Sequence, residues 1–389
     1  MKILKMIVKG HPLFKDDLEL NFVASQKITE ENKKGLYPIF SSIFKQDVIG
    51  IIGINASGKT TTLKILSCVL DIYLKNGQIN SEKYKSLLGN NRIEIQAFFS
   101  DEKRQIYKIC SILDIDNEKN RVFTEEFLWI KKLVSSTNKK NLFEFEDKHL
   151  QIIRSKENSP YLTNFMSIMI SQFKKQKNTP MMIDLLDNTN MNIVRVNGKV
   201  PMEVVKYLDN SIEYFITELE SDDKIIIRLK FVNQENEIIL NNIMHLQSYL
   251  SSGTMKGLNV FAGIQNVLLT GGYLIVDEIE NHFNKEIVRA IIQFFKDKKI
   301  NKLGATLVFT THYSELLDEF ERNDSIYIAF KDSTLKIESL NNLLVRSDYK
   351  KSEIYQSSFL GNTAPSYENF MALKKYFLNE SENLKRYNE

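Results

Sequence analysis

One eight-residue segment constrains the fold of this 389-residue chain most: Gly53–Thr60, with the sequence GINASGKT, fits the pattern GxxxxGK[ST]. The apolar run Asp47–Ile52 before it is typical of a buried strand, and a helix is expected from Lys59 to about Leu74. In this setting the backbone closes around an anion and turns N–H groups toward phosphates, whereas a chance glycine-rich turn lacks the flanking strand and helix. We therefore predict a phosphate-binding loop, in which Lys59 reaches the β- and γ-phosphates and Thr60 offers its hydroxyl to Mg²⁺. The predicted nucleotide contacts are Gly53, Asn55, Ala56, Ser57, Gly58, Lys59, Thr60 and Thr61.

A second candidate element is the apolar run Leu274–Val276, which ends in the two acids Asp277 and Glu278. We predict that Asp277 holds Mg²⁺ through water. Glu278 is predicted to orient or deprotonate the attacking water, since a carboxylate beside the γ-phosphate is the usual general base. Two carboxylates at a strand end can also be solvated loop residues. Together with the loop, they predict a nucleotide site that uses ATP and Mg²⁺.

Two further motifs complete the candidate set. Leu250–Thr254 (LSSGT) opens a helix and presents N–H groups and hydroxyls to an anion, or it is only a helix cap formed by Ser251 or Ser252. His312 follows a third apolar run, Ala305–Thr310, and can be aimed at a γ-phosphate, although a lone histidine is usually an ordinary surface or core residue.

The four motifs together resemble one group of proteins. GINASGKT, YLSSGT, LIVDEIENHF and FTTHYSELLD, in this order, are similar to AAA-type ATPases with ABC-like heads from bacterial abortive-infection and overcoming-lysogenization systems, relatives of SMC and recombination-mediator ATPases. The segments LFKDDLELNF and LLVRSDYKKSEIYQSSFLG are also similar, so the resemblance spans most of the chain and is weakest in its centre. Overcoming-lysogenization nucleases carry a C-terminal Toprim domain, whereas no acidic metal-binding cluster follows His312 here, so we expect no nuclease in this chain.

The resemblance implies roles for single residues. Catalysis would rest on Glu278, Lys59 and His312, with His312 sensing the γ-phosphate. Ser252 and Gly253 would act in trans, on the nucleotide bound by a second copy.

The segment after the acidic pair would contact that second copy through Glu280 and Asn281, with His282 beside them. A glutamine that couples the γ-phosphate and metal to the central lobe is expected after the helix of the loop. Gln96 is the nearest candidate, and the alternative is that it faces solvent from an alternating strand.

The alternation of strand and helix patterns predicts an α/β fold. We expect a P-loop NTPase of the ABC-head type with a mixed-sheet core, an antiparallel β subdomain and a helical insertion lobe. Residues 1–145 would form the N-terminal part of the ATPase head, 146–249 the helical insertion lobe, and 250–389 the C-terminal part with the signature, acidic pair, histidine and tail. The expected hairpins are Ile3–Val8 with Leu18–Phe22, Arg92–Phe99 with Gln105–Leu113, and Ser325–Phe330 with Thr334–Ser339.

Expectations for the centre and the tail of the chain are mainly helical. Glu126–Val134 is expected to lead into helical sequence, and the remaining expectations are helices at Tyr161–Phe173, Val204–Leu219, Glu286–Asp297 and Tyr367–Leu378 and a strand at Ile225–Phe231.

The composition of the chain restricts its binding partners and its cellular compartment. Lys+Arg number 52 and Asp+Glu 49, a net charge of +3, so that DNA binding would have to come from local lysine runs, which are otherwise solvated. Cys68 and Cys110 form no CxxC pair, which argues against a disulfide framework and a zinc site and favours the cytoplasm. No apolar stretch approaches the ~20 residues of a membrane span. The lysine runs are Lys131-Lys132, Lys139-Lys140, Lys174-Lys175 with Lys177, and Lys298-Lys299.

These observations predict an ATPase that converts ATP and water to ADP and phosphate, with ATP sandwiched between two copies joined head to tail. The leading interpretation is a sensor or scaffold in anti-phage defence that acts with a separately encoded effector or nuclease. The alternatives are a short-armed DNA repair or recombination ATPase and an ATP-locked scaffold without turnover. Transport is disfavoured because no membrane span is visible.

Overall fold

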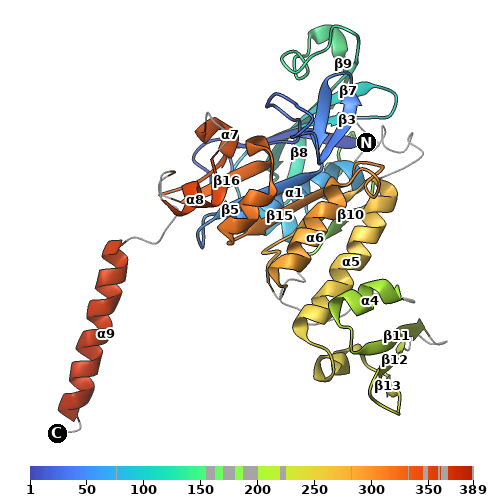
Figure 1. The fold of residues 1–389 in the computed structure, drawn as a ribbon. Coiled ribbons are helices and arrows are strands. Elements are labelled where there is room, and N and C mark those ends of the chain that lie inside the picture. The colour runs from blue at the N-terminus through green and yellow to red at the C-terminus, as the bar shows by residue number, and fades with distance from the viewer. Residues whose placement is uncertain are drawn as a thin grey trace.

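The centre of the molecule is a six-stranded mixed sheet (Figure 1). A computed structural model describes residues 1–75, 77–154, 163–169, 180–186, 200–219, 225–281, 283–331, 333–344, 349–357, 360 and 367–387. The order of strands is β10 (Met182–Asp184), β14 (Tyr273–Val276), β15 (Thr306–Thr311), β5 (Val48–Gly53), β16 (Ile326–Lys331) and β17 (Leu335–Ser339). β17 is antiparallel to β16, and all the other neighbouring pairs are parallel. The predicted α/β fold with a mixed-sheet core is confirmed.

Both faces of this sheet are covered. Alternate residues of β5 point to opposite faces: Ile49 and Ile51 pack in one core with helix α1 (Lys59–Leu70). On the other face Val48 and Ile52 pack in a core with α5 (Ser252–Thr270) and α6 (Lys285–Lys296). Parallel strands buried on both faces are nearly continuous apolar runs, which is why the sequence identified them.

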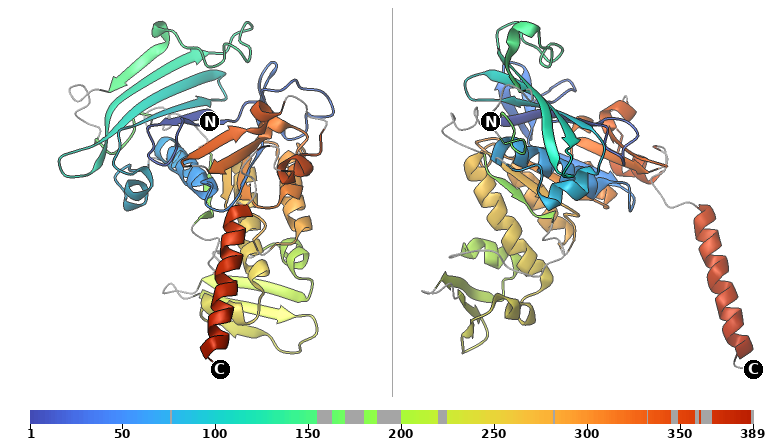
Figure 2. Two further views of the ribbon diagram at one scale, coloured as in Figure 1. Left: turned by 90° about the vertical axis from the view of Figure 1, so that its left-hand side faces the viewer. Right: turned by 180° about the vertical axis from the view of Figure 1, so that it is seen from behind.

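A second six-stranded sheet is antiparallel, and Figure 2 shows its broad, curved shape. Its strands share one hydrophobic core with α1, so that α1 lies between the two sheets. Both predicted N-terminal hairpins are confirmed, β1 with β2 and β6 with β7. The strand order is β2 (Leu18–Asn21), β1 (Lys2–Lys9), β6 (Ile93–Ser100), β7 (Gln105–Ile115), β8 (Arg121–Lys132) and β9 (Leu150–Arg154).

The expectation of helical sequence after Glu126 is wrong, because Arg121–Lys132 is one 12-residue strand. Glu126 and Leu128 point into the core, and Phe127 and Trp129 are half-buried on the opposite face. Large apolar side chains on both faces hid the two-residue period of this strand.

The region 146–249 is less helical than expected. The helix predicted over Val204–Leu219 is wrong in its second half: Asp209 accepts a hydrogen bond from the N–H of Ser211 at 3.0 Å, in a turn that ends α4 and leads into a strand. The strand at Ile225–Phe231 is confirmed. Tyr161–Phe173 lies largely outside the described residues, and its described part forms turns. Besides β9 and β10, the described elements are η2 (Asp147–His149), α4 (Met202–Leu208), η4 (Ile243–Ser248) and the sheet of β11 (Ile212–Leu219), β12 (Ile225–Phe231) and β13 (Ile238–Leu240).

The C-terminal elements follow the predicted order. The hairpin of β16 and β17 and helix α6 are confirmed. The last helix, α9 (Tyr367–Tyr387), is longer than expected and stands apart from the other elements in Figures 1 and 2. Within the described ranges, no helix has both the length and the apolar character needed to span a bilayer. The remaining elements are η1 (Asp71–Lys75), α2 (Glu82–Leu88), β3 (Leu36–Phe40), β4 (Ile43–Gln46), η5 (Ser314–Glu319), η6 (Asn323–Ser325), α7 (Leu340–Leu343) and α8 (Lys351–Gln356).

Candidate nucleotide-binding site

The predicted phosphate-binding loop joins β5 to α1. Ala56 and Gly58 have left-handed backbone conformations, with φ of 59° and 91°. A Cβ on Gly53 would lie 2.5 Å from the carbonyl oxygen of Ala329, and one on Gly58 would lie 2.6 Å from Leu335 Cδ1. Both glycines are therefore needed for the loop to pass close to the neighbouring hairpin. The loop ends at the N-terminus of α1, where unpaired N–H groups favour an anion.

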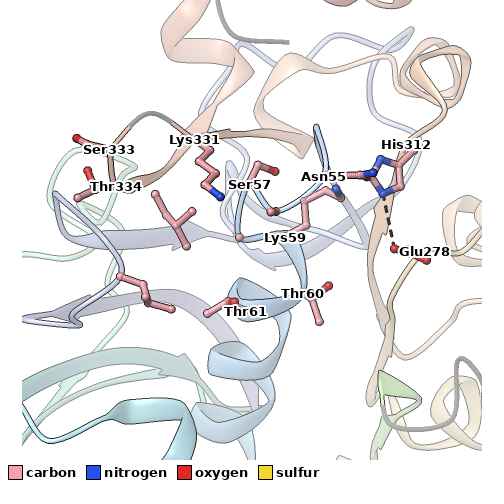
Figure 3. Close-up of a pocket in the computed structure, with 14 residues that line it drawn as sticks. Asn55, Ser57, Lys59, Thr60, Thr61, Glu278, His312, Lys331, Ser333 and Thr334 are labelled. Atoms are coloured by element: carbon pink, nitrogen blue, oxygen red, sulfur yellow. Dashed lines mark ion pairs between the residues drawn. The ribbon is translucent and has the colours of Figure 1, made fainter. Parts of the chain in front are cut away.

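A pocket of about 620 Å³ opens over this loop (Figure 3). Glu278 and His312 line it from the segments after β14 and β15. Figure 3 shows Lys331, from the end of β16, directed toward the loop. The predicted loop residues on the pocket are Asn55, Ala56, Ser57, Gly58, Lys59, Thr60 and Thr61, whereas Gly53 does not line it; the other lining residues are Leu13, Lys331, Ser333, Thr334 and Leu335.

Lys59 and Ser57 supply buried polar atoms that suit a phosphate. Lys59 is 5% exposed, and its Nζ donates to the carbonyl oxygens of Gly53 at 2.9 Å and Ile54 at 3.1 Å. Burial lowers the pKa of Lys59, and the carboxylates of the site oppose this shift. The buried Ser57 Oγ has no hydrogen-bond partner among the described residues. A buried cation and an unsatisfied hydroxyl beside a helix N-terminus fit an anionic ligand.

Asp277 is held by two hydroxyl groups and is 7% exposed. Thr60 Oγ1 donates to Oδ2 at 2.7 Å, and Thr310 Oγ1 donates to Oδ1 at 2.5 Å. A hydroxyl and a carboxylate are oxygen ligands of the kind that Mg²⁺ takes together with water and substrate phosphates. No group of three or more acidic, histidine or cysteine side chains in the described part of the chain could hold a metal. The Thr60 hydroxyl and the Asp277 carboxylate fit Mg²⁺ that also binds water and substrate phosphates.

Glu278 faces His312 at the edge of the pocket, with Oε1 3.6 Å from Nε2. The φ of Glu278 is 46°, a strained conformation for a residue with a side chain. Its N–H donates to Thr310 Oγ1 at 2.7 Å, and its Oε2 accepts from Asn281 Nδ2 at 2.6 Å. These contacts fix a carboxylate that can accept a proton beside an imidazole that can donate one.

The segment that follows supports the histidine. Glu280 is 7% exposed, and its Oε1 accepts from the backbone N–H of His312 at 2.6 Å. His282 lies outside the described residues.

The serine motif lies away from the pocket of its own chain. Ser251 is the N-cap of α5 and accepts from the N–H of Thr254 at 3.0 Å, so Ser251 is the capping residue of the two considered. Ser252 and Gly253 open α5 at its end beside α4, and neither lines the pocket (Figure 1). Their contact with the nucleotide of a second copy stays a prediction.

Gln96 is not brought to the pocket. It lies on β6, and its Nε2 donates to Glu94, so its role toward the metal stays a prediction that this geometry does not support.

Two lysines of the basic runs have partners within the fold. Lys131 Nζ donates to the carbonyl oxygens of Asn141 and Glu144, and Lys139 Nζ donates to that of Gln26 at 2.9 Å. Lys174, Lys175 and Lys177 lie outside the described residues.

The sequence did not identify several residues of the site. Thr310 contacts both Asp277 and Glu278. In the sequence, the only feature that could have predicted this role is a hydroxyl side chain at the end of a strand. The turn between β16 and β17 gave no motif, although Lys331 lines the pocket.

The family model "AAA domain, putative AbiEii toxin, Type IV TA system" matches residues 48–318. Among solved structures, the chain is similar to cbiO1 from Clostridium perfringens, part of the ABC transporter complex cbiONQ. That match has 10% sequence identity and a TM-score of 0.33, and it covers 96% of this chain and 100% of that chain. No curated protein matches the chain.

Proposed function

The chain belongs to the family of AAA domains described as putative AbiEii toxin of a type IV TA system, and we propose that it binds ATP with Mg²⁺ and hydrolyses it to ADP and phosphate. The observation that carries this proposal is the hydrogen bond between Thr60 and Asp277, which joins the phosphate-binding loop to the acidic pair. It brings together two oxygen ligands that lie far apart in the sequence, next to a buried lysine and a carboxylate.

The residues divide the chemistry among them. Lys59 and the loop N–H groups bind the β- and γ-phosphates, and Glu278 orients the attacking water and accepts its proton. His312, beside Glu278, holds the γ-phosphate in line with that water. Thr60 and Asp277, the latter through water, would hold Mg²⁺, which would supply positive charge against the charge that develops on the transferred group.

Two substitutions test this assignment. Lys59→Ala is expected to abolish binding of a fluorescent ATP analogue, because the buried cation is lost. Glu278→Gln is expected to retain binding and to lower turnover by about 10²–10⁴-fold, the range of a positioned general base. Glu286→Gln, an exposed acid of α6, is the matched control and should behave like the wild type. Normal hydrolysis by Glu278→Gln would refute the assigned base.

We also propose that ATP joins two copies head to tail. Ser252 and Gly253 begin a helix, as an anion-binding tip requires, and they do not line the pocket of their own chain. The Glu278→Gln protein should therefore dimerise with ATP, as measured by light scattering, and Ser252→Arg in the same background should remain monomeric. A monomer with bound ATP at every protein concentration would contradict the dimer.

For the biological role we propose phage defence together with a separately encoded toxic effector or nuclease. The family description names a TA system, which supports a separately encoded partner protein. Phage challenge of bacteria that express this chain, with and without the neighbouring gene, tests the role, and Lys59→Ala should remove protection. DNA-damage sensitivity after deletion would favour repair instead, and ATP binding without turnover would favour a scaffold.

A further inference from the structure

Two oppositely charged side chains are buried in neighbouring segments, and each has one polar atom without a hydrogen-bond partner among the described residues. Lys256 lies in α5, one turn after Ser252, and is 9% exposed. Its Nζ makes no hydrogen bond to any described residue and lies 5.7 Å from the centre of the Phe283 ring. Glu280 is 7% exposed, and its Oε2 also has no hydrogen-bond partner in the described part of the chain.

An unpaired buried charge is costly, and two of opposite sign in adjacent segments can relieve each other. Among the acids that act on Lys256, Glu280 exerts the strongest attraction, ahead of Glu278 and Asp277. Burial lowers the pKa of Lys256 to about 8, which is the sign of an ammonium group that lacks a partner in this state. Phe283, beside Lys256, follows Glu280 by three residues, so a movement of the start of α5 toward this segment would pair the two groups.

We propose that Lys256 is a positioning residue that forms an ion pair with Glu280 when the nucleotide of a second copy engages Ser252 and Gly253. This inference rests on the proposed head-to-tail dimer. It identifies a route by which one nucleotide site acts on the other.

The contacts of Glu280 define the rest of that route. Its Oε1 accepts from the N–H of His312 at 2.6 Å, and His312 Nε2 lies 3.6 Å from Glu278 Oε1. Pairing with Lys256 fixes the Glu280 carboxylate, and through it the backbone of His312 and the distance to Glu278. ATP held by the second copy thereby aligns the catalytic pair of the first, which makes hydrolysis at the two sites cooperative.

A double-mutant cycle in the full chain tests the ion pair. Lys256→Met removes the cation, and Glu280→Gln removes the anion but keeps an oxygen that accepts from the His312 N–H. Each single variant is expected to lower the turnover number about tenfold with little change in KM, and the double variant should be no slower than either. Lys256→Arg should restore most of the turnover, and Lys285→Met, in the neighbouring helix α6, is the control.

Thermal unfolding provides a readout that separates positioning from simple packing. Without nucleotide, Lys256→Met should be at least as stable as the wild type, because it removes a costly unpaired charge and there is no ion pair to lose. In the Glu278→Gln background with ATP, it should lose part of the stabilisation that ATP confers. A lysine that only supports the fold would lower stability equally in both states, and that result would overturn the proposal.

The outcomes separate this inference from the proposed function. A Glu278→Gln protein that never dimerises with ATP overturns the dimer and this inference together. If that protein dimerises while Lys256→Met hydrolyses ATP normally, or if the two single effects multiply to about a hundredfold in the double variant, the ion pair alone is refuted.

Discussion

Replacing Thr310 by valine should uncouple the two acids of the site without touching the nucleotide. Thr310 is fully buried at the end of β15, and valine has nearly the same shape. The substitution removes a hydroxyl that donates to Asp277 Oδ1 at 2.5 Å and accepts from the N–H of Glu278 at 2.7 Å. Asp277 and Glu278 therefore each lose a hydrogen bond when this single oxygen atom is removed.

The magnitude follows from the nature of the two hydrogen bonds. A bond to a charged group contributes about 1.5–3 kcal/mol and a neutral one about 1 kcal/mol, so Thr310→Val should lower the free energy of unfolding by about 2.5–4 kcal/mol. The left-handed conformation of Glu278 costs about 1–3 kcal/mol, which is close to what its N–H bond supplies. Without that bond the residue relaxes, and turnover should fall about 10–100-fold, since 1.4 kcal/mol corresponds to a factor of ten.

Urea unfolding and steady-state ATP hydrolysis measure the two effects separately. Thr310→Ser keeps the hydroxyl and loses only a methyl group, so it should lose about 1 kcal/mol of stability and retain turnover. If Thr310→Val hydrolyses ATP at the wild-type rate, or if Thr310→Ser is as slow as Thr310→Val, the hydroxyl does not hold the acids and the reasoning fails.

Three other substitutions or treatments have defined outcomes. Gly58→Ala should weaken ATP binding in a fluorescence titration and lower stability by about 1–3 kcal/mol, because φ is 91° and the new Cβ would lie 2.6 Å from Leu335 Cδ1. Arg154→Met should lower the free energy of unfolding in urea by about 3–5 kcal/mol, because Arg154 Nη1 lies 3.1 Å from Glu126 Oε2 and both residues are buried. Burial raises the pKa of Glu126, so the folded state favours the uncharged, protonated carboxyl as the pH falls. The stability that Arg154→Met loses should therefore be smaller at pH 5 than at pH 8. Burial also raises the pKa of Cys110 to about 11, so alkylation at pH 8, followed by mass spectrometry, should be on the order of a hundredfold slower than in the unfolded chain.

The sequence predicted the elements whose burial is uniform. β5, β14 and β15 are buried along their whole length, so their apolar runs and the turns after them gave their positions. β8 and β11 were missed because apolar residues lie on both faces of each strand. In β11, Ile212 and Phe215 enter the core while Tyr214 and Ile216 are half-buried opposite them, a pattern that a helix also satisfies.

The site was predictable where its chemistry needs charged or glycine residues in a fixed local pattern. Lys59 and Glu278, each carried by such a motif, lie on one pocket. Lys331 and Leu13 were not predictable, because they reach the pocket through the packing of two turns against the loop. The backbone hydrogen bonds between Leu13 and Leu335 and between Lys15 and Leu335 create this packing, and neither has a sequence signature.

The order of strands explains why Thr310, an uncharged residue, lies at the centre of the site. β15 lies between β14 and β5, so the ends of β14 and β5 are about 10 Å apart at the usual strand spacing. Thr60, in the first turn of α1, bridges this gap and donates to Asp277 Oδ2 at 2.7 Å. Thr310, on the strand in between, bonds to the same carboxylate from below. A shift of β14 relative to β15 therefore moves Asp277 and Glu278 together. The Thr310 hydroxyl, which no charge pattern marks, determines whether the proposed metal ligand and the proposed general base stay aligned.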